Sequence, residues 1–270
     1  MIPKIIHFIW INFNNELDEN PVIPKELSEN IDICKKINKG YEIRIWNGKE
    51  CYELVKQYFP NKYDIFINFR YPIMRCDMVR LIILYIYGGI YSDLDRVSIK
   101  SYDEIVNKYI DYDVIFSGIQ HILPIKFINN DLIIANKGSN FIYQCIQNIS
   151  EKRTNIYLVD IHGSAGSGYL FIQYYNNNTI DKIIIISELN VCNFCNKCDI
   201  NKTQNIISYS TYSGSWLSDD DLFTKISIQL FCKLQLIFFL ILIIIVIYIC
   251  LKYNKKILNK LKKILTSFNS

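Results

Sequence analysis

The sequence predicts an α/β fold built on a central, mostly parallel sheet. The first observation is a near-continuous apolar run over residues 4–11, which is typical of a parallel strand covered on both faces. The second is the alternation of strand and helix patterns after it, which indicates a wound sheet. The third is size, because 270 residues, 50% of them hydrophobic, suffice for one full core and an additional segment.

The predicted elements follow one another in a regular order. A polar loop over 12–24 contains Pro21 and Pro24, and a helix over 25–39 stops at Gly40. The remaining expected elements are strand 41–46, helix 49–59 closed by Pro60, helix 73–87, a short strand that ends at residue 95, strands 113–117 and 132–135, helix 139–150 and strand 206–210. Ligands of such sheets bind beyond the carboxyl ends of the strands.

The stretch 88–96 contains the first candidate site. Gly88 and Gly89 permit positive φ and close backbone approach after the helix over 73–87. In a strand, Leu94 would point inward while Asp93 and Asp95 share the opposite face. A divalent ion that carries a diphosphate suits two such carboxylates. The alternative is a polar strand end with two solvated aspartates, because the tripeptide Asp-x-Asp is common.

Two further positions are candidates for ligand contact. Asp77 and Arg80 stand three residues apart and share one face of the predicted helix, where they could simply form an ion pair that contributes ~0.2–0.5 kcal/mol. Trp10 ends the first strand, so it could stack on a nucleotide base or cap the core.

Several spaced motifs resemble glycosyltransferase family 32. The motifs are residues 75–81, 85–95 with the Asp-x-Asp core, 2–10 as an opening strand, 43–46 as a second strand, and Gly214-Ser215-Trp216 as a closing motif. The family includes fungal initiating mannosyltransferases and mannosyl inositol-phosphoceramide synthases, with large clostridial glucosylating toxins as more distant relatives. The resemblance covers residues 1 to about 217, strongly before residue 100 and in patches after it.

This resemblance implies a GT-A type fold and a metal-dependent hexosyltransferase. The enzyme would move a hexose from a nucleoside diphosphate sugar to a hydroxyl of a glycan or glycolipid, with retention at the anomeric carbon. Manganese or magnesium would bind Asp93, Asp95 and Ser215. The donor sugar would contact Asp77 and Arg80, while Trp10 would hold the base and Trp216 would cover the diphosphate.

The sequence departs from the family pattern just before its closing motif. Family members usually carry one or two histidines there, whereas this chain has tyrosines such as Tyr209 and Tyr212. The missing histidines prompt an alternative from another class, namely a catalytically silent, membrane-bound binding or scaffold protein.

Two other patterns leave their interpretations open. The Gly/Ser-rich stretch 160–168, with His162, resembles the place of a family Gly-Pro loop, and it could offer backbone N–H groups to a phosphate or simply begin a helix. Cys192, Cys195 and Cys198 have the spacing of half a zinc site. No fourth ligand is evident nearby, so an ordinary loop or a local disulfide is the alternative.

The end of the chain predicts a membrane anchor. A catalytic domain over 1–217 is followed by a polar connector over 218–233 and an apolar stretch over 234–251, which is long enough to be a short transmembrane helix. A buried helix is the alternative. The tail over 252–270 carries six lysines interleaved with apolar residues, as in a basic helix that lies on an anionic membrane surface.

Charge and cysteine count argue against a nucleic-acid binding protein and a disulfide scaffold, and the position of the charges indicates a membrane orientation. Because six lysines lie in the tail, the formal charge of +4 leaves the remaining chain near neutral, without a basic face for nucleic acid. Nine cysteines, an odd number, do not indicate a disulfide scaffold. The tail lysines favour a cytoplasmic C-terminus, so the catalytic domain is predicted in the lumen of the Golgi or endoplasmic reticulum. Glycosylation sequons at Asn148, Asn177 and Asn201 agree with a lumenal location, whereas the absence of an N-terminal signal argues against that location.

Overall fold

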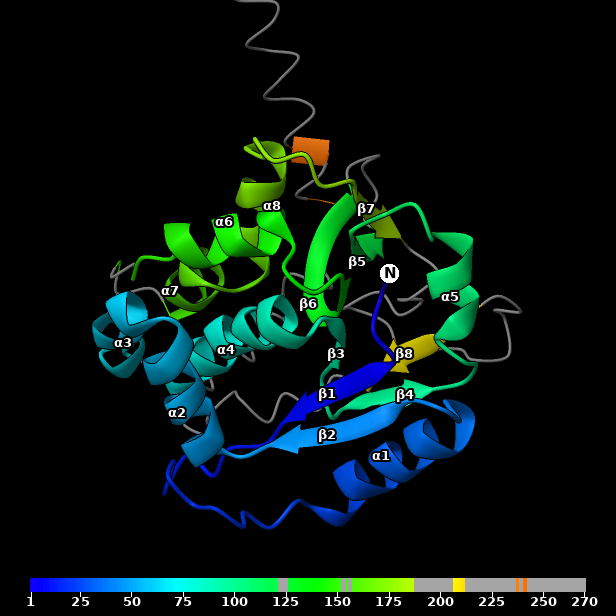
Figure 1. Cartoon of the computed structure of the whole chain (residues 1–270). Helices are drawn as coiled ribbons and strands as arrows, with labels where there is room; N and C mark the ends of the chain where they lie inside the picture. The colour runs from blue at the N-terminus through cyan, green and yellow to red at the C-terminus, as the bar shows by residue number, and fades with distance from the viewer. Residues whose placement is uncertain are drawn as a thin grey trace, which may run out of the picture. The chain divides into compact units, whose positions relative to one another are not determined.

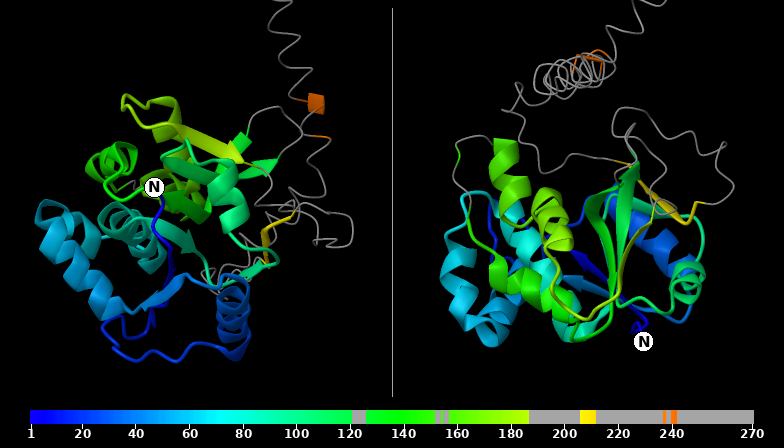
Figure 2. Two further views of the ribbon diagram at one scale, coloured as in Figure 1. Left: turned by 45° about the vertical axis from the view of Figure 1, so that its right-hand side comes forward. Right: turned by 90° about the horizontal axis from the view of Figure 1, so that it is seen from above.

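The computed structural model describes residues 1–120, 126–151, 154, 157–186, 206–211, 237 and 240–241. The chain divides into two units, Met1–Trp216 and Leu217–Ser270. Within the first unit, a central sheet has helices on both faces (Figure 1, Figure 2).

The central sheet is mostly parallel. Its order is β2 (Glu42–Trp46), β1 (Ile5–Ile9), β3 (Gly89–Ser92), β6 (Lys126–Ala135), β5 (Val114–Gln120) and β7 (Ile183–Ile186). Strand β1 runs parallel to β2 and β3, and β5 runs parallel to β7, whereas β6 is antiparallel to both of its neighbours. A second small sheet pairs β4 (Arg96–Ser98) with β8 (Ser208–Ser210). The predicted α/β fold with a mostly parallel sheet is therefore confirmed.

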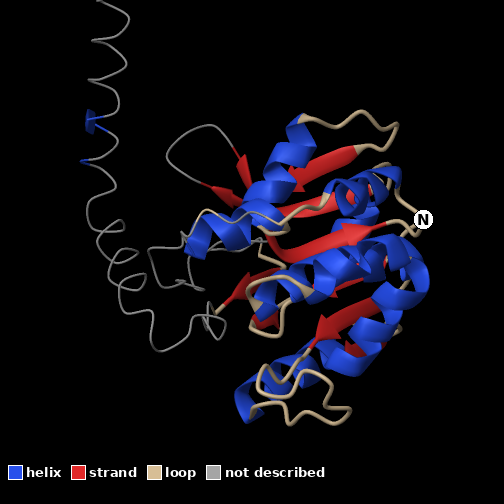
Figure 3. Ribbon diagram, turned by 90° about the vertical axis from the view of Figure 1, so that its left-hand side faces the viewer, coloured by secondary structure: helices blue, strands red, loops and turns tan. Residues whose placement is uncertain are grey.

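Each face of the sheet has its own apolar core. One core lies under the helices α2 (Gly48–Tyr58), α3 (Pro60–Ile67), α4 (Pro72–Tyr87), α6 (Asn140–Asn148), α7 (Tyr157–Ser164) and α8 (Ser167–Tyr175). The other core lies under α1 (Lys25–Ile37) and α5 (Asp103–Lys108). Figure 3 shows the first group of helices in front of the strands. Both faces are covered, which explains the continuous apolar run of β1.

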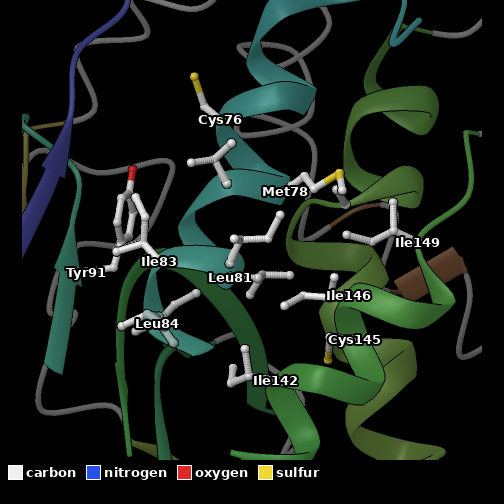
Figure 4. Packing of buried hydrophobic residues seen from close by; sticks show 14 of the residues in the cluster. Cys76, Met78, Leu81, Ile83, Leu84, Tyr91, Ile142, Cys145, Ile146 and Ile149 are labelled. Carbon is white, nitrogen blue, oxygen red and sulfur yellow. The ribbon is translucent and has the colours of Figure 1, made fainter. Parts of the chain in front are cut away.

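Helix α4 is the central helix of the larger core. Every residue from Met74 to Leu84 is buried, and Met78 and Leu81 lie among Ile142 and Ile146 of α6 (Figure 4). The helix ends at Gly88, whose φ is +66°, and Gly89 follows with φ +97°. Both glycines thus adopt the positive φ that their lack of a side chain permits. A Cβ on Gly89 would come within 2.5 Å of the Ile5 oxygen, so the close approach of β3 to β1 requires glycine.

Several boundaries differ from the prediction. Strand β3 ends at Ser92, so the predicted strand through residue 95 is wrong. Residues 93–95 instead form a turn, in which the Arg96 N–H donates to the Asp93 oxygen at 3.2 Å. Pro60 begins α3, since proline suits the first turn of a helix. The elements α5, α7, β4 and β7 were also not predicted.

Part of the prediction falls outside the described residues. This applies to Cys192, Cys195, Cys198, Ser215, Trp216, the connector over 218–233, most of the stretch 234–251 and the tail over 252–270. Among the residues that the structure describes, there is no helix of the length and apolarity that crossing a membrane would require. Ile237, Leu240 and Ile241 are described as helical, with about half of each side chain exposed.

Candidate active site at the ends of β1 and β3

Four of the predicted site residues line one cavity. Strands β1 and β3 are neighbours and parallel, so their carboxyl ends meet at the same edge of the sheet. Trp10 follows β1, while Asp93 and Asp95 follow β3. Together with Arg80 from α4, they line a cavity of about 450 Å³.

The loop after β1 forms one wall of this cavity. Asn12, Phe13, Asp18 and Val22 line the cavity beside Trp10, and the Trp10 Nε1–H donates to the Val22 oxygen at 3.0 Å. Sequence reasoning did not single out these loop residues, because a polar loop gives no periodic signal.

An ion pair anchors the same loop to α4. Arg75 Nε donates to Glu16 Oε2 at 2.8 Å, and Tyr52 donates to the same oxygen at 2.9 Å. Both members of the pair are largely buried. Arg75 thus holds the cavity wall from outside the cavity.

The backbone of the acidic turn is bonded to three separate segments. The Asp93 N–H donates to the Asp131 oxygen at 2.8 Å, and Asn30 of α1 donates to the Leu94 oxygen at 2.9 Å. Thr211, which follows β8, donates its N–H to the Asp95 oxygen at 2.8 Å. Leu94 is buried, as predicted. Because residues 93–95 form a turn, these hydrogen bonds hold both carboxylates at the cavity, without the strand alternation that was expected.

A bulge in β6 brings two polar side chains behind this turn. Phe116 pairs with Ile133 but Ser117 pairs with Asn129, so Asn130, Asp131 and Leu132 fall between the two registers. Bulges re-aim side chains and are common beside active sites. The polar run 129–131 inside an otherwise apolar strand is the sequence signal that could have marked this bulge.

Asp93 has a strongly perturbed environment. Its Oδ1 accepts a hydrogen bond from the Tyr91 hydroxyl at 2.6 Å and lies 3.3 Å from Arg80 Nη1. Burial raises the pKa of Asp93 to about 7. The charges of Asp95 and Asp131 also raise this pKa, whereas Arg80 lowers it. Two carboxylates close together repel each other, which favours a cation between them.

The donor set fits a hard divalent cation such as manganese or magnesium. Asp93 and Asp95 supply carboxylate oxygens at the cavity, and such ions prefer oxygen ligands. Within the described ranges, however, no group of three or more histidine, cysteine, aspartate or glutamate side chains is placed to hold a metal. Further ligands would have to come from the predicted Ser215, from bound substrate or from water.

Asp77 lies behind Arg80 and does not line the cavity. It is buried, with Oδ1 at 2.8 Å from Arg80 Nη2 and 2.8 Å from Asn130 Nδ2. The ion pair that was the alternative to a ligand contact is therefore present. Burial raises the pKa of Asp77, while Arg80 and His162 oppose the shift.

The Gly/Ser-rich stretch lies beside Asp77. Residues 160–164 belong to α7, and α8 begins after Gly166, where an added Cβ would come within 3.2 Å of Asp77 Oδ2. Ser167 donates to Asn130 Oδ1 at 2.8 Å. The start of α8 thus faces a buried carboxylate of the protein itself.

Comparisons with known proteins agree with the motifs. Residues 24–112 match the family described as glycosyltransferase sugar-binding region containing DXD motif. A mannosyl phosphorylinositol ceramide synthase of Saccharomyces cerevisiae is 36% identical over 95 residues, which are 35% of this chain and 23% of that protein. An inositol phosphoceramide mannosyltransferase of Schizosaccharomyces pombe is 27% identical over 64% of this chain and 50% of its own length. The chain therefore spans half or less of the length of these two relatives.

Two further comparisons extend over more of the chain. An uncharacterized glycosyltransferase of Acanthamoeba polyphaga mimivirus is 26% identical over 80% of this chain and 84% of its own length. Among solved structures, PaToxG glycosyltransferase matches with a TM-score of 0.45 and 17% identity over 65% of this chain and 69% of that chain. The resemblance drawn from the sequence is confirmed at its core, because residues 24–112 match the model of glycosyltransferase sugar-binding regions with a DXD motif and the chain is similar to curated mannosyltransferases.

Proposed function

We propose that this chain is a membrane-anchored, metal-dependent glycosyltransferase of the GT-A type. It would transfer a hexose from a nucleoside diphosphate sugar to a hydroxyl of a glycan or glycolipid, with retention. The relatives named as mannosyltransferases make mannose the first donor sugar to test. The observation that supports the proposal most directly is that Trp10, Arg80, Asp93 and Asp95 line one cavity.

The residues of the cavity have complementary roles in this proposal. The Trp10 indole, held by the Val22 oxygen, would stack on the base. Asp93 and Asp95 would hold manganese or magnesium. When bound, such an ion offsets the negative charge that develops on a diphosphate leaving group.

Arg80 would bind the donor in addition to Trp10 and the metal ion. Its guanidinium lines the cavity yet is fixed by Asp77, by Asp93 and by the Asn130 oxygen. A preorganised cation at this position would bind the diphosphate or the sugar at little cost in side-chain entropy. Asp77 would then act on the donor sugar mainly through Arg80, because its own carboxylate lies behind the cavity.

The membrane part of the proposal rests on the stretch 234–251. It contains no charged residue, and its described residues Ile237, Leu240 and Ile241 are helical and exposed. Relatives named as inositol phosphoceramide mannosyltransferases, whose names indicate a lipid acceptor, support a location at the Golgi or endoplasmic reticulum membrane.

Donor hydrolysis and transfer by the full chain in detergent test the proposal. GDP-mannose, UDP-glucose, UDP-galactose and UDP-N-acetylglucosamine are each supplied with Mn²⁺ or with EDTA, and the release of nucleoside diphosphate is measured. We expect release from one donor that depends on Mn²⁺. Metal-dependent nucleotide binding without turnover would instead favour the silent binding protein, while no binding of any donor would contradict both.

A further inference from the structure

Arg96 directly follows the acidic turn and is a buried charge outside the cavity. Its side chain is 0% exposed. Nη1 donates to Asp131 Oδ2 at 2.6 Å, and Nη2 donates to the Ser208 oxygen at 3.1 Å and to Ser208 Oγ at 2.8 Å. None of these three residues lines the cavity. A guanidinium is kept in such a place only when partners compensate its lost hydration.

Asp131 and Ser208, which bond Arg96, belong to segments that hold the acidic turn. The Asp131 oxygen accepts the Asp93 N–H at 2.8 Å. Ser208 begins β8, which pairs with β4 and leads into Thr211, and Thr211 donates both its N–H, at 2.8 Å, and its Oγ1, at 3.0 Å, to the Asp95 oxygen. The Arg96 guanidinium therefore connects two segments. One contains Asp131, which bonds the Asp93 N–H, and the other is β8, which leads to Thr211 and its bonds to the Asp95 oxygen.

Arg96 also offsets a third negative charge close to the site. Asp131 is buried and acts electrostatically on Asp93. Without the guanidinium, the charge of Asp131 would add to the repulsion between Asp93 and Asp95. Neither Arg96 nor Asp131 was singled out from the sequence.

We propose that Arg96 is a positioning residue that fixes the turn over residues 93–95, so that both of its carboxylates face the cavity, and that it offsets the charge of Asp131. The benefit for catalysis rests on the proposed function, in which Asp93 and Asp95 bind a divalent ion. The geometric part of the proposal, a turn held by Arg96, does not depend on that function.

Three variants of the full chain test this role. R96M/D131L replaces the ion pair with apolar side chains of similar size, which avoids leaving one buried charge alone. R96K keeps the charge but lacks the fork that reaches Asp131 and Ser208 together. D181A is the control for lost stability, since Asp181 accepts hydrogen bonds from Ser139 Oγ and the Phe141 N–H at the start of α6, away from the cavity.

Three measurements are made on each variant. The melting temperature reports stability. Hydrogen exchange of the Asp93 and Thr211 amides reports whether the turn is held. Calorimetric titration with GDP and UDP, in the presence of Mn²⁺, reports the binding site without requiring turnover.

The expected pattern separates positioning from stability. R96M/D131L should fold with a melting temperature near that of the wild type, while both amides exchange faster and the nucleotide affinity in Mn²⁺ falls by about tenfold or more. R96K should show the same changes to a smaller extent. D181A should melt at a lower temperature but keep the exchange of both amides and the affinity.

Wild-type exchange and affinity in a folded R96M/D131L would overturn the inference. If that variant does not fold, unchanged exchange of both amides in R96K would overturn it equally. A wild-type chain that binds neither GDP nor UDP in Mn²⁺ would instead contradict the proposed function, and the amide exchange would then decide on Arg96 alone.

Discussion

The guanidinium of Arg80 illustrates how single residues of the site are arranged. It bonds Asp77 on its own helix, Asp93 on the turn and the Asn130 oxygen on β6, and it lies over the Tyr91 ring at 4.6 Å. Each of these contacts removes rotational freedom from a long side chain. Arg80 therefore presents a fixed positive charge to the cavity.

Asp95→Ala tests the acidic turn at the residue scale. The variant removes one of the two carboxylates at the cavity, so Mn²⁺-dependent nucleotide binding should be lost and turnover should fall by about 100-fold or more. The melting temperature should change little, because truncation of a polar side chain in a turn rarely costs much stability. Asp103→Ala is the matched control, since Asp103 lies outside the cavity and bonds Lys4 and Tyr41. Wild-type turnover in Asp95→Ala would contradict a metal site there.

His7 predicts how stability depends on pH. It is fully buried, it accepts from Trp46 Nε1 through Nδ1, and its Nε2 lies 2.9 Å from the Gly88 oxygen. Burial lowers the pKa of His7 to about 4, below its ordinary value of 6.5. The unfolded chain therefore binds more protons between these values, so the stability contributed by neutral His7 is present above pH 6.5 and is lost as pH falls toward 4.

The size of this effect follows from the pKa difference and is on the order of 3 kcal/mol. Burial raises the pKa of Asp93 to about 7, so that carboxyl contributes with the opposite sign over the same range, and His7 is assessed from the difference between the wild type and His7→Gln. In urea unfolding between about pH 7 and 4.5, the free energy of unfolding of the wild type should fall relative to that of His7→Gln as the pH is lowered. Burial also lowers the pKa of His162, so a residual slope is expected in the variant. An unchanged slope in His7→Gln would assign the acid sensitivity to other groups.

At the scale of elements, the site depends on how α4, β3 and β6 meet. Helix α4 delivers the chain through Gly88 and Gly89 to β3, which lies against β1 closely enough to place residues 93–95 beside Trp10. The bulge of β6 supplies the oxygen of Asp131 for the Asp93 N–H. A shift in any of these elements would move a carboxylate relative to Arg80.

Gly89→Ala tests the close approach of β3 to β1, and Gly40→Ala is its matched control. Both glycines have φ above +90°, but an added Cβ at Gly89 would meet the Ile5 oxygen at 2.5 Å, whereas Gly40 has open space around it. Backbone strain alone costs about 1–3 kcal/mol, which both variants should show. Gly89→Ala should lose more stability than Gly40→Ala in urea unfolding, and it should also reduce nucleotide binding. Equal losses in the two variants would show that steric contact at Gly89 is unimportant.

At the scale of the whole molecule, the division at residues 216 and 217 separates the α/β unit from the apolar stretch. The proposed anchoring predicts that the full chain, expressed in cells, stays in membranes washed with alkaline carbonate. L240K/I241K places two charges in the apolar stretch, each costing ~2.5–3.5 kcal/mol at the centre of a span. This variant should move into the soluble fraction, and release of the unmodified chain would contradict the anchor.

Orientation is a separate prediction of the lysine-rich tail. If the α/β unit faces the lumen, an N-terminal tag in intact microsomes should resist protease until detergent is added. Asn148 is exposed on α6, so its sequon should also yield a glycosidase-sensitive shift that Asn148→Gln removes. A tag digested without detergent, together with no shift, would place the unit on the cytosolic side, where a zinc site at Cys192, Cys195 and Cys198 would be favoured.

Sequence alone determined the features that depend on local chemistry. The apolar run of β1, the helix of α4 with its glycine stop and the burial of Leu94 all follow from periodicity and residue type, and the structure contains each of them. The DXD motif could be identified for the same reason, because its residues are neighbours in the chain.

Tertiary structure decided what depends on segments far apart in the sequence. The turn at residues 93–95 exists because Asn30, Asp131 and Thr211 supply hydrogen bonds from α1, β6 and the end of β8. Burial and the neighbouring charges raise the pKa of Asp93. Arg96, which follows the turn, forms its ion pair with the buried Asp131. Such long-range pairings leave no periodic pattern in the chain, since their free energy comes from partners that only folding brings together.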